Sequence, residues 1–210
     1  MRFTVAGIAF LASAVIAAPS DNGLEFRTVD EVKDQLLPIS EMTFTGPVVV
    51  GGPNVTLHGD ASSIYEQILA INPTFNAEEF QEPEGGLEAR QTTRRPKSLL
   101  KAKNNWNCNQ GTYVEAYYSQ CANAINRLIT LGTNYCSVPA STCARVACSN
   151  SCSIYLCNNR FIETSVYCSD IAVDMGIIVS KCGTVANGDT RARGTLSFQS
   201  HYTYLTQQTC

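Results

Sequence analysis

Ten cysteines are the residues of this 210-residue chain whose type and spacing point most directly to chemistry. All ten lie in the second half of the chain, and the first 107 residues contain none. Thiols at such density either close disulfides in an oxidising compartment or bind a metal ion as thiolates. The ten positions are Cys108, Cys121, Cys136, Cys143, Cys148, Cys152, Cys157, Cys168, Cys182 and Cys210.

Zinc binding is the alternative to disulfide formation, because the four cysteines from Cys143 to Cys157 lie close together. Structural zinc sites are built from closely spaced ligand pairs such as C-x2-C, and the chain contains no such pair. The even number of cysteines and an export signal favour oxidation. We therefore predict five disulfides, no metal site and no cofactor. The pairing stays open because sequence alone does not determine it.

Groups suited to acid–base catalysis are few among residues 91–210. His201 is the one histidine, and it is expected at the surface or against a tyrosine. Asp170 and Asp174, four residues apart, are expected on the solvent side of a helix. Acid–base catalysis needs two positioned groups with separated pKa values. The small secreted guanyl-specific ribonucleases share the size and the α+β class of this domain but use two histidines, whereas residues 91–210 contain one. We therefore assign no catalytic residue and expect no enzymatic activity. The other carboxylates are Glu115, Glu163 and Asp189.

Positive charge gathers in two places that would attract anions in a salt-dependent way. Arg191 and Arg193 flank an expected loop. The second group is a basic arm that contains Arg94, Arg95, Lys97, Lys101 and Lys103. A solvated tail is the simpler interpretation of this arm, and no nucleic-acid partner is expected.

Aromatic residues offer a different kind of surface. Trp106, Tyr202 and Tyr204 would form a sugar-stacking surface if the ends of the domain meet.

Hydrophobic periodicity predicts the elements that position these residues. Apolar side chains recur at helical spacing over 113–131 and 165–181, and a glycine closes each stretch. The simplest arrangement packs both helices on one face of an antiparallel sheet. We therefore predict an α+β fold, a small disulfide-rich two-layer sandwich over 108–210. The expected strands are 106–108, 141–148 and 152–157, and residues 194–206 are expected to form a last strand or a hairpin. A turn is expected at 149–151 and a loop at 186–193.

Residues 1–17 have the features of a secretory signal peptide. One arginine precedes an apolar run, and the small residues around Ala17 suit cleavage by signal peptidase after that residue. No later stretch contains 18 apolar residues, so no stable membrane insertion is expected. The predicted localisation is extracellular.

Residues 18–90 are predicted to be an acidic pro-segment, followed by the basic arm at 91–107. They hold 13 acidic and 3 basic residues, whereas residues 91–210 hold 5 acidic and 11 basic ones. Such opposite charges attract, and Arg90 ends an acidic linker where a protease would cut. A strand pair within 43–50 and a serine-capped helix at 62–71 are expected here, and Asn54 is the predicted glycosylation site. A permanent acidic N-terminal arm is the alternative.

Several stretches of the second half carry a family resemblance. They are Asn107 with Cys108, residues 144–148, residues 153–156, the helix ending at Cys182 and Gly183, residues 193–198, and Cys210. In these stretches the chain resembles the small cysteine-rich killer toxins encoded by viruses of smut fungi, and related fungal effectors. The resemblance implies an α/β sandwich with five disulfides and an action on ion channels of target cells. The family's second cysteine just before Cys182 is replaced here by Val179, Ser180 and Lys181.

The expected function is that of a secreted, proteolytically matured, toxin-like or effector-like protein that acts by binding. Its expected partner is a protein or glycan on a target cell, and it is expected to be a monomer. A lectin-like protein that binds cell-wall glycans is the first alternative. A small secreted hydrolase is the second.

Overall fold

The computed structural model describes residues 37–80 and 105–210. The predicted signal peptide, the cleavage sites at Ala17 and Arg90 and most of the basic arm lie outside the described residues. Within the described ranges, no helix is both long enough and apolar enough to cross a membrane.

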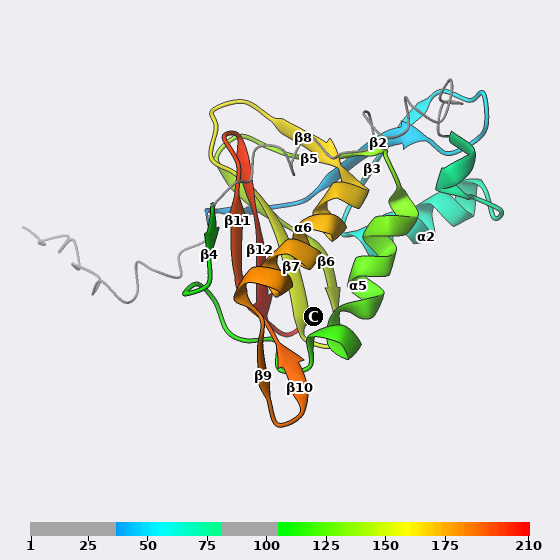
Figure 1. The fold of residues 1–210 in the computed structure, drawn as a ribbon. Helices are drawn as coiled ribbons and strands as arrows, with labels where there is room; N and C mark the ends of the chain where they lie inside the picture. Colours follow the sequence, from blue (N-terminus) through cyan, green and yellow to red (C-terminus); the bar gives the residue numbers. More distant parts are fainter. Residues whose placement is uncertain (1–36, 81–104) are drawn as a thin grey trace, which may run out of the picture.

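A six-stranded sheet carries two helices on one face (Figure 1). Helices α5 (Tyr117–Leu131) and α6 (Cys168–Cys182) pack against each other and against the strands. All neighbours in the sheet are antiparallel except β1 and β6. The structure therefore confirms an α+β fold with mostly antiparallel sheets. The strand order is β1 (Ile39–Ser40), β6 (Thr142–Ser149), β7 (Cys152–Asn158), β12 (His201–Gln207), β11 (Gly194–Ser197) and β4 (Trp106–Asn107).

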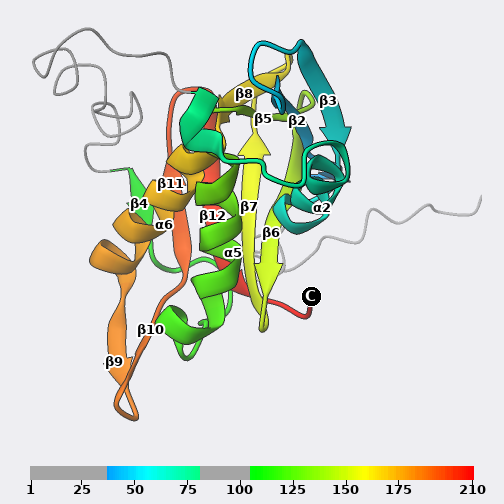
Figure 2. The same ribbon diagram turned by 90° about the vertical axis from the view of Figure 1, so that its right-hand side faces the viewer.

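A second sheet, which the sequence did not predict, joins the two described parts of the chain (Figure 2). Its order is β3 (Asn54–His58), β2 (Thr43–Pro47), β5 (Tyr135–Val138) and β8 (Thr164–Tyr167). Helix α2 (Ala61–Ile71) and the short 3-10 helix Ala77–Phe80 follow β3. Side chains from both parts of the chain belong to one apolar cluster that includes Phe44, Ile64, Leu128 and Val138.

Two expectations for the N-terminal part were wrong in detail. The segment 43–50 is not a strand pair, because β2 ends at Pro47 and its partner in the hairpin is β3. Helix α2 ends at Ile71 as expected, but it is capped by Asp60 and not by a serine. The Asp60 carboxylate accepts a hydrogen bond from the Ser63 N–H at 2.9 Å, which satisfies one of the free N–H groups at the helix start.

Three boundaries in the C-terminal part also moved for tertiary reasons. Helix α5 begins only at Tyr117, because Val114 forms a β-bridge with Ala192. The second helix was expected to begin at residue 165, but residues 165–167 belong to strand β8. The expected loop at 186–193 is mostly a hairpin of β9 (Thr184–Ala186) and β10 (Asp189–Arg191).

Two hairpins of the protein turn through a pair of residues with positive φ. The β9–β10 turn uses Asn187 (φ 52°) and Gly188 (φ 87°), while the β6–β7 turn uses Asn150 (φ 46°) and Ser151 (φ 66°). Such turns favour Asn-Gly, because a left-handed conformation costs about 1 kcal/mol in a residue that has a Cβ.

Ser151→Gly is therefore expected to raise the free energy of unfolding by about 1 kcal/mol. Urea unfolding of the two purified chains measures the change. Gly188→Ser is the matched control and is expected to lower stability by a similar amount, since a Cβ at Gly188 meets no described atom within 4 Å. An unchanged midpoint in the Ser151 variant would contradict the turn-strain argument.

Candidate functional site

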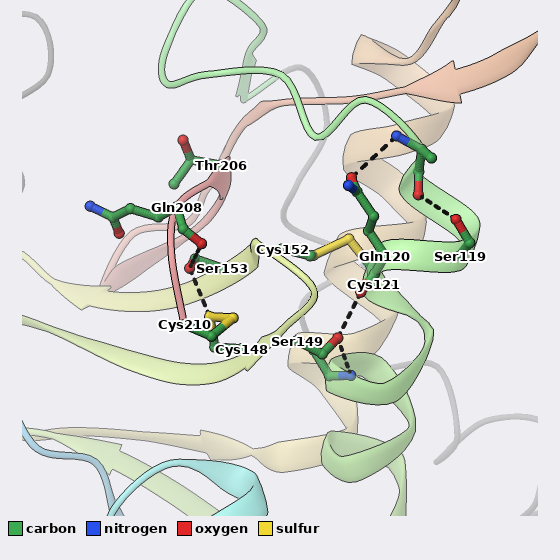
Figure 3. Close-up of a disulfide and its surroundings, with 12 residues drawn as sticks. Ser119, Gln120, Cys121, Cys148, Ser149, Cys152, Ser153, Thr206, Gln208 and Cys210 are labelled. Carbon is green, nitrogen blue, oxygen red and sulfur yellow. Dashed lines mark hydrogen bonds between the residues drawn. A yellow bond between two sulfur atoms is a disulfide. The ribbon is translucent and has the colours of Figure 1, made fainter.

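All ten cysteines form disulfides, as the sequence predicted. Two of these bonds clamp the β6–β7 hairpin end to helix α5 and to the C-terminus (Figure 3). With every cysteine oxidised, none is available as a thiolate ligand or nucleophile. The pairs, which the sequence left open, are Cys108–Cys182, Cys121–Cys152, Cys136–Cys168, Cys143–Cys157 and Cys148–Cys210.

Ser149 adds a polar clamp beside the Cys121–Cys152 bond (Figure 3). Its hydroxyl donates to the Gln120 carbonyl at 2.7 Å and accepts from the Ala124 N–H at 3.2 Å. A serine hydroxyl thus lies between two backbone groups that an ordinary helical turn would pair with each other. Two disulfides and these two hydrogen bonds thus tie the β6–β7 hairpin end to α5 and to the C-terminus.

Asp174 does not lie on the solvent side of α6, which corrects the prediction. The carboxyl is 2% exposed, because α6 packs on α5 with one side and on β11 and β12 with another. Burial raises its pKa well above the ordinary value, and the nearby Asp170 carboxylate raises it further. Asp170 is half-buried, which also raises its pKa. The Thr203 hydroxyl beside Asp174 acts in the opposite direction and lowers the pKa of Asp174. Within the described residues, neither Asp174 Oδ1 nor Thr203 Oγ1 has a partner at ordinary hydrogen-bond geometry.

His201 is neither at the surface nor packed against a tyrosine, contrary to expectation. The imidazole is 8% exposed and stacks on Phe198, with 4.6 Å between ring centroids. Its Nδ1 lies 2.9 Å from the Ser200 hydroxyl. Burial lowers the pKa of His201 to about 4, so the ring is neutral at physiological pH. It serves here as a packed ring in the sheet.

The three aromatic residues considered for sugar stacking do not meet. Tyr202 and Tyr204 belong to a small cluster around the Cys143–Cys157 disulfide, whereas Trp106 packs against the main core. The Lys181 ammonium lies over the Trp106 ring, 5.2 Å from its centroid. No common surface of these three rings exists.

A different set of aromatic and charged side chains does come together, and we call it the hairpin face: Tyr113, Glu115, Arg191 and Arg193. The antiparallel bridge between Val114 and Ala192 creates it. Val114 and Ala192 point into the core, so the residues on either side of each one point outward together.

The Tyr113 ring contacts two guanidinium groups of the hairpin face. The Cζ atoms of Arg191 and Arg193 lie 4.5 Å and 4.3 Å from its centroid, and both contacts are cation–π interactions. Glu115 Oε2 lies 3.9 Å from Arg191 Nη1. Arg193 also donates to the Cys108 carbonyl at 3.1 Å and to the Gly111 carbonyl at 2.7 Å, which fixes its position.

An open groove of about 460 Å³ is lined by the start of α5, the second half of α6 and the β9–β10 hairpin that carries Arg191. Tyr118 (68% exposed) and Val185 (76% exposed) stand at its wall. Tyr117 also lines the groove, and burial raises its pKa to about 12, which keeps its hydroxyl protonated. The groove therefore offers aromatic and aliphatic surface. Arg191 follows the lining residue Thr190 in β10 but does not itself line the groove.

Gly176, a residue in the middle of helix α6, lines this groove. A glycine within a helix costs about 0.5–1 kcal/mol of stability relative to alanine. Among the described residues, nothing lies within 4 Å of the position that a Cβ would occupy, so internal packing does not require the glycine. Its effect is to leave the helix backbone accessible along the groove.

Comparison with family models, curated proteins and solved structures found no match to this chain. The killer-toxin resemblance therefore stays an expectation. Asn54, the predicted glycosylation site, is exposed at the start of β3.

Proposed function

We propose that this protein is a secreted, proteolytically matured, toxin-like or effector-like protein that binds an acidic protein on the surface of a target cell. The observation that carries the proposal is the cation–π contact of Tyr113 with both Arg191 and Arg193, where Arg191 lies on the strand whose Thr190 lines the open groove. Tyrosine and arginine are enriched at the energetic centres of protein interfaces, where a rigid ring and a planar cation lose little entropy on binding.

Charge supports an acidic partner. The hairpin face itself holds two guanidinium groups against one carboxylate, so its local charge is positive. A cationic face speeds encounter with an acidic surface and disfavours basic ones. Gly176 adds a steric argument, because its missing side chain lets a partner group approach the α6 backbone.

One observation favours the lectin-like alternative. The Tyr118 ring is largely exposed at the wall of the groove, where it presents a flat surface on which a sugar ring could stack. The two functions differ in what competes for the site, so one binding assay separates them.

The test measures binding of fluorescently labelled protein to intact fungal and plant cells. Arg191→Ala and Gly176→Leu are each expected to weaken saturable binding at least about tenfold, the loss typical of an interface hot spot. Pretreating the cells with protease is expected to abolish binding, and free sugars are expected to leave it unchanged. Competition by sugars would instead support the lectin.

Two exposed residues provide matched controls. Arg160→Ala removes a surface arginine, and Phe161→Ala removes a ring that is 93% exposed. Both precede β8, which lies at the end of the molecule opposite the β9–β10 hairpin (Figure 1). They are expected to bind as the unchanged protein does. Equal losses in all four variants would show that the hairpin face and its groove are not the binding site.

A further inference from the structure

No disulfide joins the two described parts of the chain, although they share a core. We call residues 37–80 the N-terminal module and residues 105–210 the disulfide-bonded body. All five disulfides lie inside the body, and the chain has no cysteine before Cys108. If a protease cuts between the two, only non-covalent contacts hold them together.

The module completes both sheets of the body through main-chain pairing. In β2, Thr43, Phe44 and Thr45 pair with three residues of β5. In β1, Ile39 and Ser40 pair with β6, and the Ser40 and Thr142 hydroxyl oxygens lie 2.9 Å apart. Without the module, β5 and β6 would each present an open edge, which is an aggregation hazard in water.

Apolar side chains of the module fill the space beside these strands. Phe44, Ile64 and Ile68 are fully buried in the cluster that contains Leu128 and Val138 of the body. Helix α2 packs along α5 and β6. Separation of the module would expose apolar surface on both sides, which is strongly unfavourable in water.

Close steric fit and a charged contact add specificity. The backbone at Gly46 lies so near the Asn134 side chain that any Cβ there would collide with it. A Cβ on Gly132 of the body would lie 2.7 Å from that of Ala77. The Arg127 guanidinium lies over the Tyr65 ring, 4.5 Å from its centroid. Such contacts resemble a protein interior more than a transient interface.

We infer that cleavage after Arg90 produces a protein of two chains, in which the N-terminal module stays bound to β5, β6 and α5 of the body. The inference rests on the maturation step of the proposed function. The module lies at the end of the molecule away from the β9–β10 hairpin in both views (Figures 1 and 2). The hairpin face therefore stays open to a partner while the module covers the sheet edges.

The experiment cuts the purified chain in vitro with an arginine-specific protease, and mass spectrometry confirms that cleavage is confined to residues 90–95. Because the protease is added, the result does not depend on processing by the producing cell. Both fragments are expected to co-elute in gel filtration at the volume of the uncut chain and to separate only under denaturing conditions. Elution of the body alone, or its aggregation, would overturn the inference.

Variants then locate the contact. Phe44→Ala and Tyr65→Ala are expected to make the cut protein dissociate at protein concentrations at least tenfold higher than the unchanged protein requires. Near-UV circular dichroism of the uncut chains checks folding, and the milder Tyr65 change keeps the test usable if Phe44→Ala does not fold. Val50→Ala, in a module residue that is 64% exposed, is the control. Identical dissociation of all three variants would contradict the proposed contact.

Discussion

Asp174→Asn is expected to make the protein more stable at neutral pH, by up to about 4 kcal/mol, the free energy needed to protonate an ordinary carboxyl at pH 7. Asp174 is a buried carboxyl on α6 whose neighbours are the Asp170 carboxylate and the Thr203 hydroxyl. Asparagine keeps the shape of the side chain and removes its charge. The gain therefore comes from electrostatics, with little change in packing.

The gain should depend on pH in a defined direction. Burial raises the pKa of Asp174 in the folded protein well above its ordinary value of 3.8. The protonated carboxyl is fully tolerated below pH 3.8, and stability is lost as the pH rises through the raised pKa. The variant lacks this loss, so the two proteins should differ little near pH 3 and most at neutral pH.

Urea unfolding of both proteins between pH 3 and pH 8 measures this dependence. His201 titrates in the opposite sense, because its lowered pKa of about 4 makes the fold lose stability as the pH falls from 6.5. It does so in both proteins and therefore cancels in their difference. Asp189→Asn, at an exposed position, is the control. A constant difference across the pH range would show that the Asp174 charge is not responsible.

The buried Asp174 also shows what the sequence could not predict. Periodicity located α6 to within three residues at its start, since Ile171, Met175 and Ile178 follow helical spacing. It could not show that a second side of the helix is buried, because this depends on α5 and on two strands that pair from distant parts of the chain. Packing against α5, β11 and β12 buries a wider part of the helix surface than periodicity predicts, and this part includes Asp174.

Strands β5 and β8 were missed for a related reason. Each has four residues, too few to establish an alternating pattern, and β8 runs directly into the start of α6. The sequence could have predicted part of the hairpin face, because Arg191 and Arg193 are two residues apart and so share one side of an extended segment. Their partner Tyr113 is distant in sequence, and only the bridge between Val114 and Ala192 brings it near.

The acidic charge of the N-terminal module made its packing into the core hard to predict. The net −10 of residues 18–90 supported a pro-segment attracted to residues 91–210 by charge, but net charge averages over faces that the fold separates. Asp60 and Glu66 are not fully buried, while Ile64 and Ile68 on the same helix are completely covered. Helical spacing over only three turns gives too weak a signal to predict what such a stripe packs against.

Removing single disulfides should rank their contributions by the length of chain that each one closes. Replacing both Cys108 and Cys182 by alanine is expected to cost about 4 kcal/mol, because this bond spans 74 residues. The same change at Cys143 and Cys157, which spans 14 residues, is expected to cost about 3 kcal/mol. Guanidinium unfolding of the full chain without reductant gives both values.

Binding should separate the two variants more sharply than stability does. Cys182 precedes Gly183, which lines the groove, and the Cys108 carbonyl accepts a hydrogen bond from Arg193 of the hairpin face. The Cys143–Cys157 bond lies in the separate tyrosine cluster. Under conditions where both variants are folded, the first is therefore expected to lose cell binding and the second to keep it. Retained binding without the Cys108–Cys182 bond would mean that partner recognition does not need the geometry of the hairpin face.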